Sequence, residues 1–189
     1  IRETFPKNIT ARSQLAPRAR LVSGDATQLH QVLMNLCVNA RDSMPSGGGL
    51  TLGLEEMEVD EALARTGLEC RPGPYVVLTV TDTGTGIPAE HLDKIFDPFF
   101  TTKQVDEGTG LGLSTVLGIV RSHHGMIKVN SQPSKGTQFR VYLPGCESAN
   151  AGETPTTSSV PPQGQGELVL VADDEDAVRG VTRSILERN

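Results

Sequence analysis

The sequence predicts an α/β fold, because segments with the alternation of β-strands are interspersed with segments that have the spacing of helices. Leu50, Leu52 and Leu54 alternate with smaller or polar residues, which is typical of a strand. Apolar residues at helical spacing indicate a long helix, namely Leu29, Val32, Leu33, Leu36 and Ala40. A polar, glycine-rich stretch over residues 97–111 is predicted to be a loop, and a loop this long in a compact domain is typical of a lid.

The N-terminal elements follow from local signals. Residues 2–15 predict one or two edge strands. The long helix is expected to begin at Asp25, a good N-cap residue, and Gln28 at the third helical position completes a capping-box pattern. The Pro- and Gly-rich stretch 45–49 ends the helix, and residues 57–73 are expected to form a loop with a short helical turn.

The C-terminal elements are predicted in the same way. We expect a strand over 75–82, a short helix over 88–96, and a closing hairpin that pairs 126–129 with 138–143. A second amphipathic helix precedes the hairpin, and Gly125 lies just past its end. The apolar and last-turn positions of that helix are Leu113, Val116, Leu117, Val120, His123 and His124.

The bulk composition excludes several classes of protein. Hydrophobic residues make up 37% and charged residues 21% of the 189 positions, which allows a packed core. The formal net charge of -6 argues against a nucleic-acid-binding surface, and no apolar run is long enough to span a membrane. We expect Cys37, Cys70 and Cys146 to be free thiols in a reducing compartment, and therefore a cytoplasmic location.

The composition shifts sharply after the last predicted strand. Residues 145–166 are rich in Ser, Thr, Pro, Gly, Gln and Glu and offer almost nothing to bury, so we expect a flexible linker. Residues 168–172 then predict a short buried strand and 176–188 a helix. The expected organisation is a domain over 1–144, the linker, and the start of a second domain over 167–189.

Four constellations of residues could carry chemistry, and the first lies on the long helix. Asn35, Asn39 and Asp42 are four and three positions apart and share one face, which Gln28 and Gln31 extend. Taken alone, this polar stripe fits a solvated helix face better than a ligand site.

The second constellation begins at Asp82, the end of a predicted strand. Asp82 projects to the same side as the apolar row before it, which consists of Val76, Leu78 and Val80. A buried carboxylate needs a hydrogen-bond donor, and the adenine amino group is one, whereas guanine presents an oxygen there. Gly84 and Gly86 would let the backbone approach a flat ligand. A tight turn with Asp82 as its cap is the competing interpretation.

The third constellation is aromatic. Three of the five Phe residues, Phe96, Phe99 and Phe100, fall within five positions and precede Thr101-Thr102-Lys103. The phenylalanines could anchor a lid or meet a partner domain, and Lys103 could reach phosphates. A hydrophobic satellite cluster with a solvated lysine explains the same residues equally well.

The fourth constellation is the glycine run from Gly108 to Gly112, which leads directly into the second helix. Unpaired backbone N–H groups and the helix dipole make such a start an anion site. The run is neither a Walker loop nor a dinucleotide fingerprint, because no Lys-Ser/Thr pair follows it and position 113 is Leu. A lone glycine run of this kind would be weak evidence.

Together these motifs resemble the catalytic ATP-binding domain of sensor histidine kinases, in the superfamily that also holds gyrase, a heat-shock chaperone and MutL. Over about residues 1–144, the matching motifs are the N box at 35–40, the first glycine box at 82–86, the F box at 96–100 and the second glycine box at 108–112. The resemblance implies a Bergerat-type two-layer α/β sandwich. In that fold a mixed, mostly antiparallel sheet is covered on one face by helices and carries a lid loop.

The resemblance also implies roles for individual residues. Asn39 would coordinate Mg²⁺ through its amide oxygen, Asp82 would hold the adenine amino group, and Thr137 would border the adenine end. Ser134 stands where the family commonly has glycine, and we expect little effect. The full set of cofactor-binding residues implied is Asn35, Asn39, Asp42, Asp82, Gly84, Gly86, Ile87, Lys103, Gly108, Thr109, Gly110, Leu111, Gly112, Leu113 and Thr137.

Residues 167–189 resemble the start of a response-regulator receiver domain. Asp173 and Asp174 would form its acidic Mg²⁺ pair, since paired carboxylates suit a hard cation. The phosphoacceptor aspartate of that family would lie further along than Asn189, so we expect this segment not to work as a receiver as it stands.

These resemblances imply the ATP- and Mg²⁺-binding catalytic domain of a hybrid histidine kinase. It would supply the γ-phosphoryl group to a histidine on a dimerisation domain N-terminal to this chain, and a receiver domain or response regulator would be the further partner. No catalytic residue is expected here beyond the ATP site, because all four histidines read as surface or helix-end residues. They are His30, His91, His123 and His124.

Two alternatives stay open at this point. One is a non-catalytic module that uses the fold only to hold a partner. The other is an ATPase of the gyrase or MutL type, which would need a catalytic glutamate on the long helix, and no Glu occurs between Asp25 and Met44.

Overall fold

The structure is a computed structural model, and it describes residues 5–16, 19–60, 71–102 and 109–146. The chain divides into two compact units, Ile1–Ala149 and Asn150–Asn189, and every described residue belongs to the first. The linker, the receiver-like segment and Cys70 therefore lie outside the described residues, as does 61–70, the middle of the loop predicted over 57–73. That prediction is wrong for residues 57–59, which are strand.

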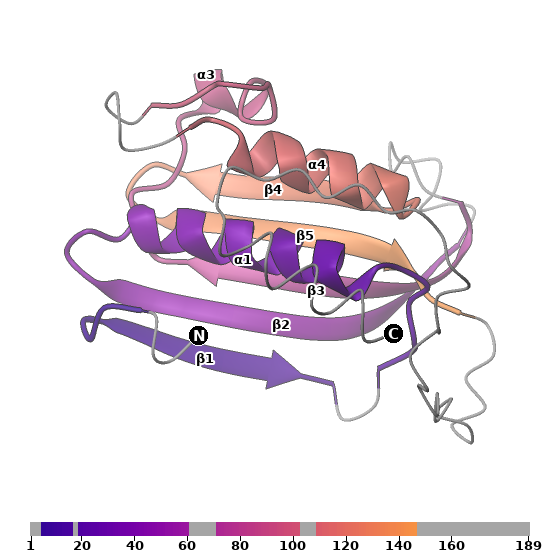
Figure 1. Ribbon diagram of the computed structural model, residues 1–189. Coiled ribbons are helices and arrows are strands. Elements are labelled where there is room, and N and C mark those ends of the chain that lie inside the picture. Colours follow the sequence, from indigo (N-terminus) through magenta and orange to yellow (C-terminus); the bar gives the residue numbers. More distant parts are fainter. Residues whose placement is uncertain (1–4, 17–18, 61–70, 103–108, 147–189) are drawn as a thin grey trace, which may run out of the picture. The chain divides into compact units, whose positions relative to one another are not determined.

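A five-stranded sheet with the order β1-β2-β3-β5-β4 forms one layer (Figure 1). Only β1 and β2 are parallel, and the other three pairs are antiparallel. The strands are β1 (Ile9–Leu15), β2 (Gly48–Val59), β3 (Gly73–Asp82), β4 (Met126–Gln132) and β5 (Gly136–Pro144). The predicted mixed, mostly antiparallel sheet is thus confirmed.

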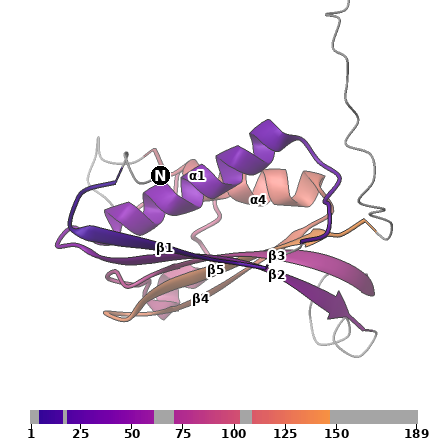
Figure 2. The same cartoon turned by 90° about the horizontal axis from the view of Figure 1, so that it is seen from below.

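Helices cover one face of this sheet and form the second layer (Figure 2). The long helices α1 (Ala26–Asp42) and α4 (Gly112–Ser122) lie side by side there, and the short helix α3 (Ala89–Leu92) follows β3. In the described part of the chain, no helix is both long and apolar enough to cross a membrane.

The main core fills the space between these two layers. Leu36 of α1, Val116 of α4 and Val141 of β5 are completely buried in it. Burying each such side chain stabilises the fold by roughly 1.5–3 kcal/mol. Cys37 shares this core, and its burial raises the pKa of the thiol to about 11, so the thiol stays protonated and unreactive.

The start of α1 is capped from two directions. Asp25 is the predicted N-cap, and its Oδ1 accepts from the backbone N–H groups of Thr27 at 2.7 Å and Gln28 at 3.1 Å. The capping-box pattern predicted at Gln28 also implies that the Asp25 N–H donates to the Gln28 side chain, and this part of the prediction is wrong. The Asp25 N–H instead donates to His123 Nε2 at 3.0 Å, so a residue from the end of α4 completes the cap.

The end of α4 also differs from the prediction. His124, not Gly125, adopts the left-handed conformation, with φ 55°. Its N–H donates to the Arg121 carbonyl at 2.9 Å, and the Gly125 N–H donates to the Val120 carbonyl at 2.9 Å. This is a Schellman ending shifted by one residue. Gly125 serves close packing, since a Cβ there would lie 2.5 Å from the backbone carbonyl oxygen of Tyr142.

The helix predicted over 88–96 is much shorter in the structure. Only Ala89–Leu92 is α-helical, and turns follow it. The His91 carbonyl accepts from both Lys94 N–H at 2.8 Å and Ile95 N–H at 3.1 Å, and Asp97 N–H donates to Lys94 at 2.9 Å. These turns end the helix after Leu92.

Candidate functional site

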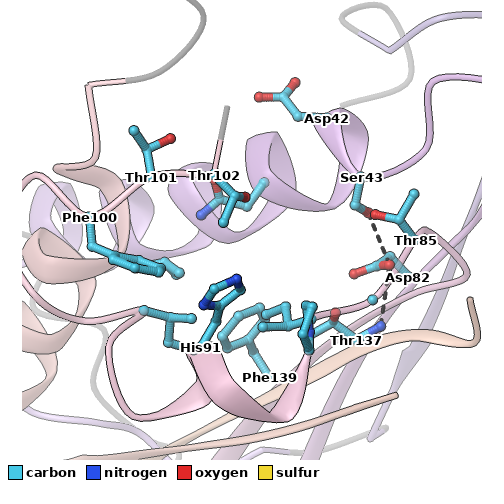
Figure 3. Close-up of a pocket in the computed structure, with 16 residues that line it drawn as sticks. Asp42, Ser43, Asp82, Thr85, His91, Phe100, Thr101, Thr102, Thr137 and Phe139 are labelled. Carbon is cyan, nitrogen blue, oxygen red and sulfur yellow. Dashed lines mark hydrogen bonds between the residues drawn. The ribbon is translucent and has the colours of Figure 1, made fainter. Parts of the chain in front are cut away.

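A cavity of about 260 Å³ opens between the C-terminal end of α1, the ends of β3 and β5, and the segment around α3 (Figure 3). Its lining combines one buried carboxylate with several apolar walls. The lining residues are Asn39, Asp42, Ser43, Asp82, Thr85, Gly86, Ile87, Pro88, His91, Ile95, Phe100, Thr101, Thr102, Leu113, Thr137 and Phe139. We call this the base cavity.

Asp82 is the anchor of the base cavity. The residue is only 4% exposed, as its place at the end of the apolar row predicts. Its Oδ1 accepts three hydrogen bonds, from Gly84 N–H at 2.8 Å, Ser43 Oγ at 3.0 Å and Thr137 N–H at 3.3 Å. Its second carboxylate oxygen points into the cavity (Figure 3). An acceptor therefore faces any ligand that enters.

Burial sets the electrostatics of this carboxyl. Removal from water raises the pKa of Asp82 above its usual value, and the hydrogen bonds from Gly84, Ser43 and Thr137 oppose that rise. A hydrogen-bond donor on a ligand would replace hydrogen bonds to water that the Asp82 carboxylate loses on burial. Apolar residues such as Ile87 and Phe139 also line the cavity, which suits a flat aromatic ring.

A second cavity of about 310 Å³ adjoins the first. The two share six lining residues, namely Asn39, Asp42, Ile95, Phe100, Thr101 and Leu113. The second is further lined by Asn35, Val38, Arg41, Thr109, Gly110 and Gly112. We call it the loop cavity, because the glycine loop before α4 forms one side of it.

The glycine loop is held in place by its neighbours. Phe99 N–H donates to the Gly110 carbonyl at 3.1 Å, and Asn35 Nδ2 donates to the Gly112 carbonyl at 3.3 Å. Gly110 has φ 66°, and a Cβ there would approach within 2.7 Å of Phe99 Cα. Only glycine fits this position, since both the conformation and the contact exclude a side chain.

The loop cavity has the features of an anion site. The helix α4 begins at Gly112, and its N-cap residue Leu111 makes no side-chain capping bond. In the described part of the chain, no side chain accepts from the backbone N–H groups of Gly112, Leu113 and Ser114, and the helix dipole favours negative charge there. Arg41 also lines this cavity, where it pairs with Asp42 Oδ1 through Nε at 2.9 Å.

The structure brings most of the predicted site residues to the two joined cavities. The base cavity contains Asn39, Asp42, Asp82, Gly86, Ile87, Leu113 and Thr137. The loop cavity adds Asn35, Thr109, Gly110 and Gly112. Gly84 and Leu111 line neither cavity, and Gly84 instead packs behind Asp82 against Ser43. Lys103, Gly108, Asp173 and Asp174 lie outside the described residues.

Several lining residues were missed by the sequence analysis. Ser43 follows the polar stripe of α1 by one position, so its bond to Asp82 could have been sought there. Phe139 lies in the predicted hairpin strand 138–143 but was not predicted to border a ligand. His91, expected at the surface, instead lines the base cavity, and nothing in its local sequence signals this.

Comparison with known proteins identifies the family of the chain. Residues 24–146 match the family of histidine kinase-, DNA gyrase B-, and HSP90-like ATPases. The sensor kinase CckA of Brucella abortus (strain 2308) is 43% identical over 175 residues, covering 88% of this chain and 18% of CckA. Sporulation kinase A of Bacillus subtilis (strain 168) is 41% identical over 123 residues, covering 65% of this chain and 18% of that protein.

A solved structure gives the same result for the fold. The mycobacterial sensor histidine kinase MprB superposes with a TM-score of 0.58 at 28% identity, covering 73% of this chain and 83% of that chain. This chain therefore belongs to the histidine kinase-, DNA gyrase B-, and HSP90-like ATPase family, as an ATP-binding catalytic domain of the histidine-kinase type. It spans 18% of the length of the two curated relatives.

Proposed function

We propose that this chain binds ATP with Mg²⁺ and that its parent protein is a hybrid histidine kinase. In that protein the domain would supply the γ-phosphoryl group to a histidine on a dimerisation domain. The observation that carries the proposal is the junction of two cavities, one anchored by the Asp82 carboxylate and the other bordered by Gly110, with Asn39 lining both.

The two cavities match the two ends of the nucleotide. The adenine amino group would donate to the free oxygen of Asp82, with the ring between Ile87 and Phe139. The triphosphate would extend into the loop cavity toward Gly110 and Gly112. The same carboxylate oxygen would face the O6 acceptor of guanine, so the site favours ATP over GTP.

The donor chemistry at the junction fits Mg²⁺. Asn39 carries an amide oxygen and Asp42 a carboxylate, and both line both cavities. Mg²⁺ prefers oxygen ligands and is usually held by one or two protein groups together with substrate phosphates. Bound there, it would neutralise charge on the triphosphate. The residues of this chain contribute position and electrostatics, and the acceptor histidine comes from the partner domain.

The hybrid architecture is supported from outside the ATP domain. The match to CckA covers 88% of this chain, which is more than residues 1–146 could supply, so the likeness continues past Cys146. We propose that residues 167–189 begin a receiver domain, with Asp173 and Asp174 as its Mg²⁺ pair. A receiver domain or response regulator would then take the phosphoryl group from the histidine.

We further propose that the domain works in the cytoplasm, whether or not the parent protein is membrane-anchored.

Calorimetric titration of the purified chain with ATP, with and without Mg²⁺, tests the proposal. We expect ATP binding that is tighter with Mg²⁺, and we expect Asn39→Ala to remove most of the Mg²⁺ effect because the amide oxygen at the junction is lost. Asn130→Ala, on β4 and outside both cavities, is the matched control. Absence of ATP binding in the folded wild type would favour a non-catalytic interaction module instead.

A gyrase- or MutL-type ATPase makes a different prediction. That activity would need a glutamate on α1 to activate water, and α1 contains none. We therefore expect no steady ATP hydrolysis by the isolated chain. Sustained phosphate release above a heat-denatured control would point to the ATPase alternative.

A further inference from the structure

We infer that His91 reads the ribose of the bound nucleotide through a hydrogen bond from its imidazole to a sugar hydroxyl. The inference rests on the proposed ATP function. It adds a specificity-determining residue on α3 to the proposed nucleotide site.

The backbone of His91 is held firmly in place. Its N–H donates to the Pro88 carbonyl at 3.0 Å, and its own carbonyl accepts from Lys94 and Ile95. The imidazole points into the base cavity, in the space between Phe100 and Phe139 (Figure 3). The side chain keeps 30% of its surface exposed, so a ligand can reach the ring nitrogens.

The position of His91 along the site selects the sugar as its target. His91 lines the base cavity together with Asp82, and it does not line the loop cavity. Phe100 lines both cavities, and its ring lies 5.5 Å from the imidazole at an interplanar angle of 57°. The imidazole is therefore on the base side of the junction, and the ribose is the part of a nucleotide that joins base to phosphates.

The two ring nitrogens of His91 are available to form a hydrogen bond with a ligand. Within the described residues, the charged group beside the imidazole is the Glu90 carboxylate. Its Oε1 lies 3.7 Å from His91 Nε2, which is too distant for a hydrogen bond. Glu90 is itself 78% exposed at its side chain. Neutral imidazole offers one donor and one acceptor, and a ribose hydroxyl can accept the first or donate to the second. The tilted contact with Phe100 restricts the orientations that the ring can adopt.

Calorimetric titration with ATP, 2′-deoxy-ATP and 3′-deoxy-ATP tests the inference. We expect the wild type to bind at least one deoxy analogue roughly threefold to tenfold more weakly than ATP, the effect of one hydrogen bond. His91→Phe keeps a ring against Phe100 but has no ring nitrogen, so it should bind all three nucleotides equally. His91→Gln retains a donor and an acceptor and should restore part of the discrimination. His30→Ala, at an exposed position of α1, is the control.

The outcomes separate this inference from the proposed function. If the wild type binds ATP and both deoxy analogues equally, or if His91→Phe discriminates as the wild type does, His91 does not read the ribose while ATP binding stands. A contact to phosphate would weaken all three nucleotides alike in His91→Phe and leave their ratios unchanged, which also overturns the inference. If the folded wild type binds no ATP, both proposals fail together.

Discussion

At the scale of single residues, the site depends on a buried carboxylate with its hydrogen bonds divided between protein and ligand. Three donors hold Asp82 Oδ1, and the other oxygen faces the base cavity. Ser43 contributes one of the three, although its Oγ also lies 2.8 Å from the Ala40 carbonyl and its single proton can serve either oxygen. Asp82 is therefore positioned by the protein and left with an acceptor for the base.

Replacing Asp82 by Asn should weaken ATP binding. The amide must point its NH₂ group either at the adenine amino group or at the N–H groups of Gly84 and Thr137, so a donor faces a donor in both orientations. An unmet buried donor costs about 1–3 kcal/mol, which corresponds to an increase in Kd of roughly fivefold to a hundredfold. Calorimetric titration measures it, with the exposed Asp93→Asn as control. An unchanged Kd would place the adenine elsewhere.

Comparison of the wild type with Asp82→Asn also tests whether burial raises the pKa of Asp82. Because burial raises the pKa of Asp82 in the folded state above its usual 3.8, the folded protein favours the protonated form. That contribution to stability is fully present below pH 3.8 and is lost as the pH rises through the raised pKa. The wild type should therefore lose stability relative to Asp82→Asn as the pH rises from about 3.5 to 7.

Denaturant unfolding of both proteins across this pH range gives the difference directly. The constant effect of the lost hydrogen-bonding geometry cancels, because only the change with pH is compared. A difference that grows in favour of the wild type toward neutral pH would mean that hydrogen bonds outweigh burial at this carboxyl.

The sequence predicted that Asp82 belongs to the site but not that His91 lines it, and the difference has a physical cause. The two-residue period of a strand assigns Asp82 to the apolar side of β3, and burial follows from that side. A four-residue helix such as α3 has too few positions to show a period. Whether His91 faces a cavity or water thus depends on how the whole segment packs against Phe100.

At the scale of elements, α1 and α4 are joined at their ends as well as along their length. His123 Nδ1 lies 2.8 Å from the Ile119 carbonyl, an acceptor, so Nδ1 carries the proton and Nε2 accepts from Asp25 N–H. One side chain therefore links the last turn of α4 to the first turn of α1. These two helices also carry Gly112 and Asn39, which border the loop cavity.

Replacing His123 by Ala should loosen this link. The variant loses the acceptor for Asp25 N–H and the bond to Ile119, and we expect the free energy of unfolding to fall by about 1–2 kcal/mol. Chemical denaturation measures it, with His30→Ala on the exposed side of α1 as control. A loss no larger than in the control would show that water replaces His123 without cost.

The elements themselves were predictable to different degrees. The helix α1 and the strands β3 and β5 appear where periodicity predicts them, because burial on one face imposes a regular pattern. The caps were less predictable. The cap from His123 joins residues 98 positions apart, and no local pattern reports such a contact. Ser134 adopts φ 62° in the β4–β5 turn, a conformation that explains the usual glycine at this position.

At the scale of the whole molecule, the sheet order brings distant motifs together. The strand β5 lies between β3 and β4, so Thr137 at the start of β5 reaches Asp82 at the end of β3. The helix pair above the sheet then places Asn39 between that end and the glycine loop. Local patterns could not predict this order, because strand pairing depends on contacts across the chain. The resemblance to a known family implied a mixed, mostly antiparallel sheet but no strand order.

The most direct test is a crystal structure of the chain with Mg²⁺ and a non-hydrolysable ATP analogue. Our account predicts the adenine amino group within hydrogen-bonding distance of the Asp82 carboxylate, and the phosphates beside Asn39 and the Gly110–Gly112 loop. A nucleotide bound outside the two joined cavities, or bound with its base in the loop cavity, would contradict the account.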